Sequence, residues 1–238
     1  MQGSRRRSAL LARLAGRTAG RAPVVILDEL RACILDGEVP PGSPIPVDGV
    51  AAAFGVSRIP VREALMTLIG EGLVDHRPHL GYQVARLTAQ EFGEIYLVRE
   101  ALETAALRVA VALADASDDE RARAAHATLE RAVVAGDRRA HHRESRRFHL
   151  ALLRPCRMGR LLHMLDTAWN LTEPLQPMSY LDGAERELLH GDHARMLAAF
   201  TARDGEALLR VCAEHHHRLQ GYVARLPKDT GLFAEPEA

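Results

Sequence analysis

A helix-forming segment at residues 56–73 combines a start signal, an apolar stripe, two arginines and a glycine stop, and it restricts the fold more than any other part of the sequence. Ser57 suits the N-cap because its hydroxyl can accept hydrogen bonds from the free amides of the first turn. Pro60 lies early enough that its missing N–H costs little. The helix therefore presents Arg58 and Arg62, one turn apart, on a different face from the apolar stripe. That stripe is formed by Val61, Leu65, Leu68 and Ile69.

The flanking segments complete a small domain around this helix. Residues 50–54 are apolar and precede Gly55, so a helix, a tight glycine turn and a second helix follow one another, as in a helix-turn-helix. Residues 73–84 predict two short strands joined by a proline- and glycine-containing turn at residues 77–81. A further helix is expected over residues 24–36. Together these elements predict a winged helix-turn-helix.

This pattern resembles the DNA-binding domain of the GntR family of bacterial transcription regulators. Two arginines on an amphipathic helix are usually just a solvated face, but here the match extends over about forty residues. The matching residues are Pro41-Gly42, Val50-Ala51, Gly55-Val56-Ser57-Arg58, Pro60-Val61-Arg62-Glu63-Ala64-Leu65, Glu71-Gly72-Leu73-Val74 and Gly81. The resemblance implies that Arg58 and Arg62 contact double-stranded operator DNA and that the wing around Gly81 approaches the minor groove. The candidate DNA-binding residues are Ser57, Arg58, Pro60, Arg62, His79 and Gly81.

The charge of this domain is unusual for a DNA-binding protein. Residues 23–87 hold five arginines against eight carboxylates, and Leu80 stands where the family often has an arginine. Affinity for DNA normally depends on neutralising phosphates. Residues 1–22 contain six arginines and no acidic residue, which predicts either a flexible basic arm along the DNA backbone or a solubilising tail.

The rest of the chain predicts helices only. Thr88 and Glu91 have the spacing of a capping box that opens a long helix ending near residue 115. No strand pattern follows residue 87, and the short breaks between helices favour antiparallel neighbours. Further helices are expected at residues 118–135, 137–153, 159–173, 183–202 and 204–226. The predicted fold is therefore mainly α, with a winged helix-turn-helix at 23–87, an all-α antiparallel bundle at 88–226 and a tail at 227–238.

This second half resembles the FCD ligand-sensing domain that accompanies the winged helix in the FadR subfamily. The matching residues are Arg99, Glu103, Phe148-His149, His193, Ala199, Asp204 and His215. The resemblance implies a divalent metal inside the bundle beside a small carboxylate effector. It assigns His149, His193 and His215 as the imidazole ligands, and zinc or nickel suits such a set.

One position departs from that pattern. The resemblance places an aspartate four residues before His149, but the residue there is Ser145. Glu144 lies about 140° around the helix from His149, so it cannot substitute without distortion. His190 is a better substitute, because it shares a helix face with His193.

Each histidine has a simpler alternative, because a lone histidine on an apolar face is usually a hydrogen-bonded core residue. Arg99 likewise has two expected partners, since it can form a fork with an effector carboxylate or pair with Glu103 one turn away. The candidate effector-binding residues are Arg99, His149, Trp169, His190, His193 and His215.

Composition is consistent with a bacterial cytoplasmic protein. No apolar stretch reaches the ~20 residues that span a bilayer, so no membrane partner is expected. Three cysteines without a CxxC pair are expected to be reduced. One lysine against thirty arginines favours a high-GC bacterial source.

The predicted function is a ligand-controlled transcription regulator, not an enzyme, that binds its operator as a homodimer. The effector, an organic acid, would favour one packing of the bundle and so change operator affinity. Two alternatives stay open at this point. One is a helical interaction module with protein or nonspecific DNA binding, and the other is a three-histidine metal-dependent hydrolase.

Overall fold

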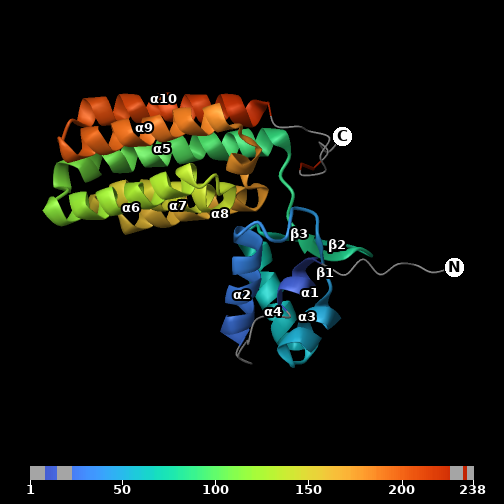
Figure 1. The fold of residues 1–238 in the computed structure, drawn as a ribbon. Helices are drawn as coiled ribbons and strands as arrows, with labels where there is room; N and C mark the ends of the chain where they lie inside the picture. Colours follow the sequence, from blue (N-terminus) through green and yellow to red (C-terminus); the bar gives the residue numbers. More distant parts are fainter. Residues whose placement is uncertain (1–8, 15–22, 226–232, 235–238) are drawn as a thin grey trace. The chain divides into compact units, whose positions relative to one another are not determined.

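The computed structural model describes residues 9–14, 23–225 and 233–234 of the chain. The chain divides into two compact units (Figure 1). The first is built mainly from residues 1–89, and the second from residues 90–169 and 176–227. The predicted fold class, a winged helix-turn-helix and an all-helical bundle, is confirmed.

The helices of the first unit are α1 (Ala9–Leu14), α2 (Pro23–Leu35), α3 (Val47–Phe54) and α4 (Arg58–Gly70). The turn between α3 and α4 depends on Gly55, whose φ of 64° is left-handed and favours glycine. Ser57 occupies the N-cap of α4 with extended backbone, but its exposed side chain makes no capping hydrogen bond. The predicted capping role of its hydroxyl is therefore wrong, although the helix begins where expected.

The wing is an antiparallel hairpin of β2 (Val74–Arg77) and β3 (Gly81–Val84), with His76 opposite Tyr82. The two predicted strands are thus confirmed. A third strand, β1 (Pro44–Ile45), pairs with the other side of β3 and gives the order β1-β3-β2. Its two residues are too short a segment to show an alternating pattern.

Within the N-terminal segment, residues 9–14 are described, and they form a helix rather than part of a flexible arm. Residues 9–14 form α1, and Leu10 and Leu14 are 0% and 3% exposed in the core of the first unit. Arg13 pairs with Glu38 at 3.4 Å. These apolar contacts correct the prediction for residues 9–14, because burial of the leucines fixes the helix. The other five arginines of the arm lie outside the described residues.

The second unit consists of helices joined by short turns (Figure 1). The elements are α5 (Ala89–Leu113), α6 (Ala116–Val134), α7 (Arg138–Leu153), η1 (Arg154–Cys156), α8 (Gly159–Thr172), η3 (Pro177–Tyr180), α9 (Gly183–Thr201) and α10 (Gly205–Ala224); η2 (Glu173–Leu175) belongs to the first unit. Helix α6 packs on α7 and α9, and α9 packs on α10. Hydrogen bonds and ion pairs join α5 to α10.

Aspartates fix where three of these helices begin. Asp115 and Asp182 each form a full capping box, with Asp118 and Glu185 respectively, and Asp137 accepts from the amide of Ala140. Each cap satisfies amides that the helix leaves without a partner. Helices α6, α7 and α9 therefore have defined starting points.

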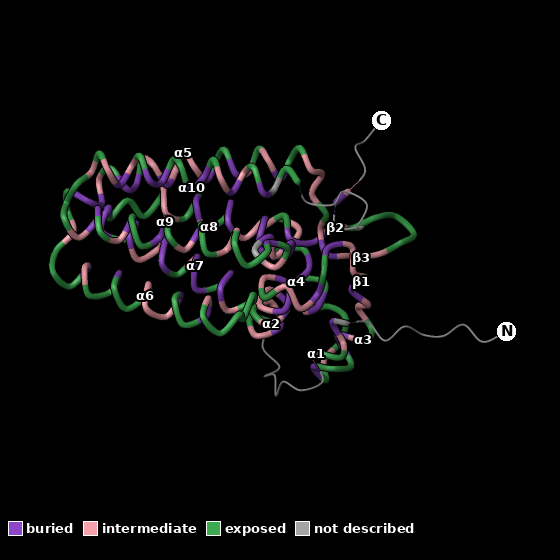
Figure 2. The backbone as a smooth tube through the Cα atoms, turned by 45° about the horizontal axis from the view of Figure 1, so that its top comes forward, coloured by how far each residue is buried: buried purple, intermediate pink, exposed green. Residues whose placement is uncertain are grey.

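Buried residues follow the inner faces of the helices (Figure 2). The bundle core is mainly Leu, Ala and Phe, but it also contains buried carboxylates and imidazoles, and these polar groups define the candidate site. The three cysteines are buried and form no disulfide. Among the described residues, no helix is both long and apolar enough to cross a membrane.

Candidate metal centre and nucleic-acid interface

Three buried histidines from three helices meet inside the bundle. His149 lies on α7, His193 on α9 and His215 on α10, and they are 6%, 0% and 2% exposed. Each offers a ligand atom, and these atoms all lie within 4.8 Å of one another. The structure therefore brings together the three residues that the sequence predicts as metal ligands.

The orientation of His149 is fixed by Glu103 on α5. The Nδ1 of His149 lies 3.0 Å from Oε2 of Glu103, so an Nδ1–H group donates to this carboxylate. The lone pair is then on Nε2, which lies 3.2 Å from Nε2 of His193. Adjacent nitrogens bound to one ion are ~3.0–3.4 Å apart when the metal–nitrogen bonds are about 2.1 Å. The separation thus fits two ligands of one divalent ion.

Two of the three histidines, His193 and His215, have the protonation state that metal binding requires. Burial lowers the pKa of His193 well below its usual range, and the neighbouring histidines lower it further. Burial likewise lowers the pKa of His215 to about 4, although Asp192 opposes the change. Neutral imidazoles are the form that binds a metal. Nδ1 of His193 has no hydrogen-bond partner in the described structure.

Two buried carboxylates stand behind the imidazoles. Glu103 is completely buried; burial alone would raise its pKa, but its interactions with His216 and His149 hold the pKa well below the usual range. Asp192 is 2% exposed and lies 3.5 Å from Nδ1 of His215. Burial would raise the pKa of Asp192, but its contacts with His215 and two arginines lower it to about 2. Both carboxylates are therefore ionised.

Ser145 occupies the place where the resemblance puts an aspartate. It is 6% exposed, and its Oγ lies 3.4 Å from Nε2 of His193. Glu144 instead pairs with Arg143 at 2.8 Å and with Arg147 at 2.9 Å. The described residues around the three imidazoles thus include a neutral hydroxyl where the aspartate was expected.

An aromatic-lined arginine lies next to the histidines. The Arg99 guanidinium lies 4.5 Å from the ring centre of Tyr96 and 4.8 Å from that of Trp169. The Trp169 ring centre is 6.1 Å from that of His149. The structure therefore gathers Arg99, Trp169 and His149, three of the candidate effector residues.

His190 is a neighbour of His193, but its ring stacks on a histidine from another helix. Its ring stacks on His126 at a centroid distance of 4.9 Å and lies 6.3 Å from the ring of His193. It is not part of the three-histidine group. Sequence spacing missed this stacking because His126 comes from α6, far away in the chain. The spacing also missed His216, which lies 3.4 Å from Glu103.

In the first unit, α4 exposes the predicted DNA-contacting residues. Arg58 and Arg62 are both exposed, and Arg58 forms an ion pair with Asp48 of α3. At the wing tip, His79 and Gly81 adopt φ values of 66° and 80°. The exposed tip and the two arginines lie on the elements that contact DNA in winged domains.

Comparisons with known families match both units. Residues 24–84 match the family described as bacterial regulatory proteins, gntR family, and residues 94–218 match the FCD domain. The fold is that of E. coli McbR/YncC, with a TM-score of 0.76 and 23% identity over 85% of this chain and 97% of that one. A putative GntR regulator from Rhodococcus sp. RHA1 also gives a TM-score of 0.76, at 23% identity, over 86% of this chain and 98% of that one.

Curated relatives are transcription regulators. The chain is 31% identical to the probable D-xylose utilization operon transcriptional repressor of Paenarthrobacter nicotinovorans, over 86% of this chain and 89% of the relative. It is 26% identical to the HTH-type transcriptional repressor RspR of Escherichia coli (strain K12), over 87% of this chain and 91% of the relative. Such regulators are not enzymes, so neither a hydrolase nor a nonspecific interaction module is favoured. The chain belongs to the GntR family of DNA-binding transcription regulators, and its helical unit is an FCD effector-binding domain.

Proposed function

We propose that this regulator changes its operator affinity when a small carboxylate effector binds beside a divalent metal in the helical unit. The observation that carries the proposal is the cluster of His149, His193 and His215, with the Arg99 guanidinium close by. Three neutral imidazoles suit zinc or nickel. Acting on DNA, the protein would work in the cytoplasm of a bacterium.

Several groups around the three histidines would together bind an anionic effector. A bound divalent ion would supply a positive charge for a carboxylate oxygen. Arg99 adds a planar guanidinium whose N–H groups can bind a carboxylate through two parallel hydrogen bonds. The rings of Trp169 and Tyr96 both contact this guanidinium, which limits the directions in which it can donate. His190 is proposed to border the effector through its proximity to His193.

The DNA-binding end is proposed to use α4 and the wing. Arg58 and Arg62 would reach base edges in the major groove, where an arginine fork pairs with guanine. Ser57 and Pro60 at the start of α4, and His79 and Gly81 at the wing tip, would contact the backbone and minor groove. Arg58 must break its ion pair with Asp48 before it can contact a base.

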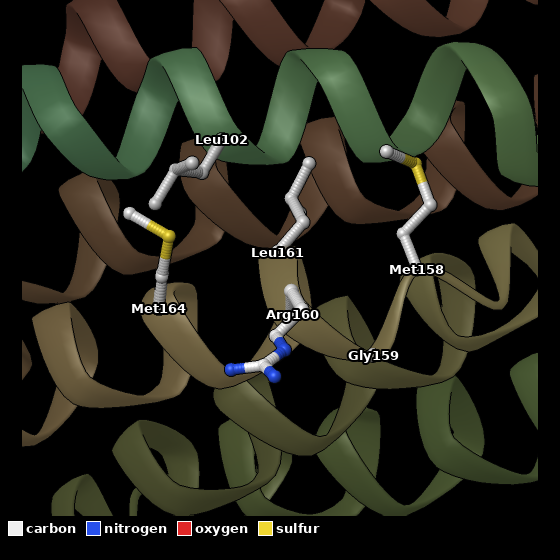
Figure 3. Close-up of a pocket in the computed structure, with 6 residues that line it drawn as sticks. All are labelled: Leu102, Met158, Gly159, Arg160, Leu161 and Met164. Atoms are coloured by element: carbon white, nitrogen blue, oxygen red, sulfur yellow. The ribbon is translucent and has the colours of Figure 1, made fainter.

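A homodimer is proposed because one winged domain buries little surface and paired half-sites raise affinity and specificity. An apolar groove of about 460 Å³ between α5 and α8 supplies a face for a second copy of the chain. Leu102 and Leu161 lie between the two helices, flanked by Met158 and Met164 (Figure 3). The two methionines are 40% and 60% exposed, and Val98, one turn before Leu102, is 50% exposed.

The test measures DNA binding and metal binding separately. The full chain selects its operator from random duplex DNA, and binding is measured by fluorescence anisotropy at fixed salt. Arg62→Ala should weaken binding to the selected operator about 5- to 150-fold, as expected from ~1–3 kcal/mol for a good arginine–guanine pair. Zn²⁺ and Ni²⁺, alone and with citrate or gluconate, should raise the melting temperature of both wild type and Arg62→Ala. If Arg62→Ala binds the operator as tightly as the wild type, the proposed role of α4 in DNA binding is wrong. If neither metal raises the melting temperature, the proposed metal site is wrong.

A further inference from the structure

The metal centre proposed above has no anion among its expected direct ligands. Ser145 stands where the resemblance places an aspartate, and its Oγ is 3.4 Å from Nε2 of His193. The three imidazoles are neutral donors. A divalent ion there would keep its whole double positive charge inside a buried site, and such a charge requires a nearby counter-charge.

Glu103 supplies a negative charge one hydrogen bond away. Its side chain is completely buried on α5, and its Oε2 accepts from Nδ1 of His149 at 3.0 Å. The same oxygen lies 3.4 Å from Nε2 of His216, and Oε1 lies 3.8 Å from Nε of Arg99. The shortest of these contacts is therefore the one to the metal-binding candidate.

An ordinary ion pair with Arg99 does not account for this placement. The separation of 3.8 Å between Arg99 and Glu103 exceeds hydrogen-bond distance, and Oε1 has no hydrogen-bond partner in the described structure. A carboxylate whose main role was to neutralise Arg99 would make its closest contact there. Glu103 makes it to His149 instead.

Asp192 provides a comparison inside the same protein. It also lies behind a candidate ligand, 3.5 Å from Nδ1 of His215. However, Arg195 at 2.6 Å and Arg218 at 3.1 Å both bind its oxygens. Its charge is thus already compensated by two guanidinium groups, whereas that of Glu103 is directed to the histidines.

We propose that Glu103 is the positioning residue of the metal centre, which holds His149 with its Nε2 lone pair toward the ion and supplies the anion that Ser145 does not. This inference rests on the proposed metal centre. A carboxylate that accepts from the second nitrogen of a ligand histidine fixes its tautomer and makes it a stronger donor. In this chain the negative charge of Glu103 therefore acts on the ion through His149, and Glu103 does not bind the ion directly.

The experiment uses four forms of the full chain: wild type, Glu103→Gln, Glu103→Asp and the control Glu100→Gln. Glu100 lies on the same helix but accepts from Gln220 at 3.0 Å, away from the three histidines. Each protein is titrated with Co²⁺ alone, and binding is followed by visible absorption. In the metal-free proteins, long-range ¹H–¹⁵N NMR identifies which nitrogen of His149 carries the proton.

Glu103→Gln should lower Co²⁺ affinity about 10- to 100-fold. Glu103→Asp should lose less Co²⁺ affinity because it keeps the negative charge. Glu100→Gln should bind Co²⁺ as tightly as the wild type does. His149 should be protonated on Nδ1 in the wild type. In Glu103→Gln the two tautomers should mix, because an amide can either accept from or donate to Nδ1. A tautomer readout separates positioning from a general loss of stability.

Three results would overturn the inference. The first is equal Co²⁺ affinity in wild type and Glu103→Gln, and the second is an unchanged His149 tautomer. The third is a thiolate charge-transfer band, which would show that Glu103, Cys212 and His216 bind the ion directly as a separate buried group. If the wild type binds no Co²⁺, the proposed metal centre itself is wrong, a result distinct from a wild type that binds while Glu103→Gln binds equally well.

Discussion

At the scale of single residues, Ser145 is the position where this chain differs most informatively from the pattern that it resembles. Ser145→Asp should raise Co²⁺ affinity at least about tenfold, because it adds an anionic oxygen beside His193 at a site where outer carboxylates alone change affinity by that amount. Ser145→Ala should change affinity little. Titration followed by quenching of Trp169 fluorescence measures all three proteins, since Trp169 is the single tryptophan and its ring lies 6.1 Å from His149. If Ser145→Asp binds Co²⁺ no more tightly than the wild type, the metal centre does not include position 145.

Asp48 is the second residue with a specific consequence. It pairs with Arg58 on the exposed face of the winged unit, so it competes with DNA for the guanidinium and repels phosphate. Asp48→Asn should therefore tighten operator binding a few-fold at low salt, with a smaller gain as salt screens the charges. Asp36→Asn, which makes the same change of charge at the end of α2, is the control. If both variants gain equally, net charge alone explains the effect and the Arg58 pair does not restrict binding.

At the scale of elements, the helix starts set where the histidines lie. The capping box of Asp182 and Glu185 opens α9, which carries His190 and His193. Asp182→Ala should lower the free energy of unfolding by about 1 kcal/mol, as the loss of an N-cap usually does. Urea unfolding followed by Trp169 fluorescence measures it, and Glu187→Ala on the exposed side of α9 should stay within about 0.5 kcal/mol. A similar loss in both variants would show that the cap is not what holds the start of α9.

The sequence predicts the elements better than it predicts their contacts. Apolar periodicity and the Gly55 turn gave the helix-turn-helix, and the turn at residues 77–81 gave the wing. The strand β1 and the helix α1 were not predictable, because the first has two residues and the second depends on burial of Leu10 and Leu14 against other elements. The resemblance selected three histidines that do meet in space. It gave no sign of the contacts of Glu103 with His149 and His216, since these join helices that are far apart in the chain.

At the scale of the whole molecule, operator binding should depend on a second copy of the chain. Val98→Glu places a charge on the exposed surface of α5 one turn before Leu102 of the α5–α8 groove, so it should shift the protein toward monomer in sedimentation velocity and weaken operator binding at least about tenfold. Co²⁺ affinity should not change. Val134→Glu, at the 83% exposed end of α6, should remain as the wild type. If Val98→Glu is still a dimer, the subunit interface must lie on another face of the protein.

In the proposed function, the three-histidine centre controls the affinity of the protein for DNA. The most direct test of this control is the anisotropy of the selected operator at fixed salt, measured with the wild type and with His193→Ala, in Zn²⁺ with excess citrate or gluconate and again in chelator. We expect operator affinity to change at least about fivefold between the two conditions for the wild type, the lower end of typical allosteric coupling. The change should vanish in His193→Ala while the chelated proteins bind equally. The same operator affinity in every condition, from a wild type shown to bind the metal, would contradict the claim.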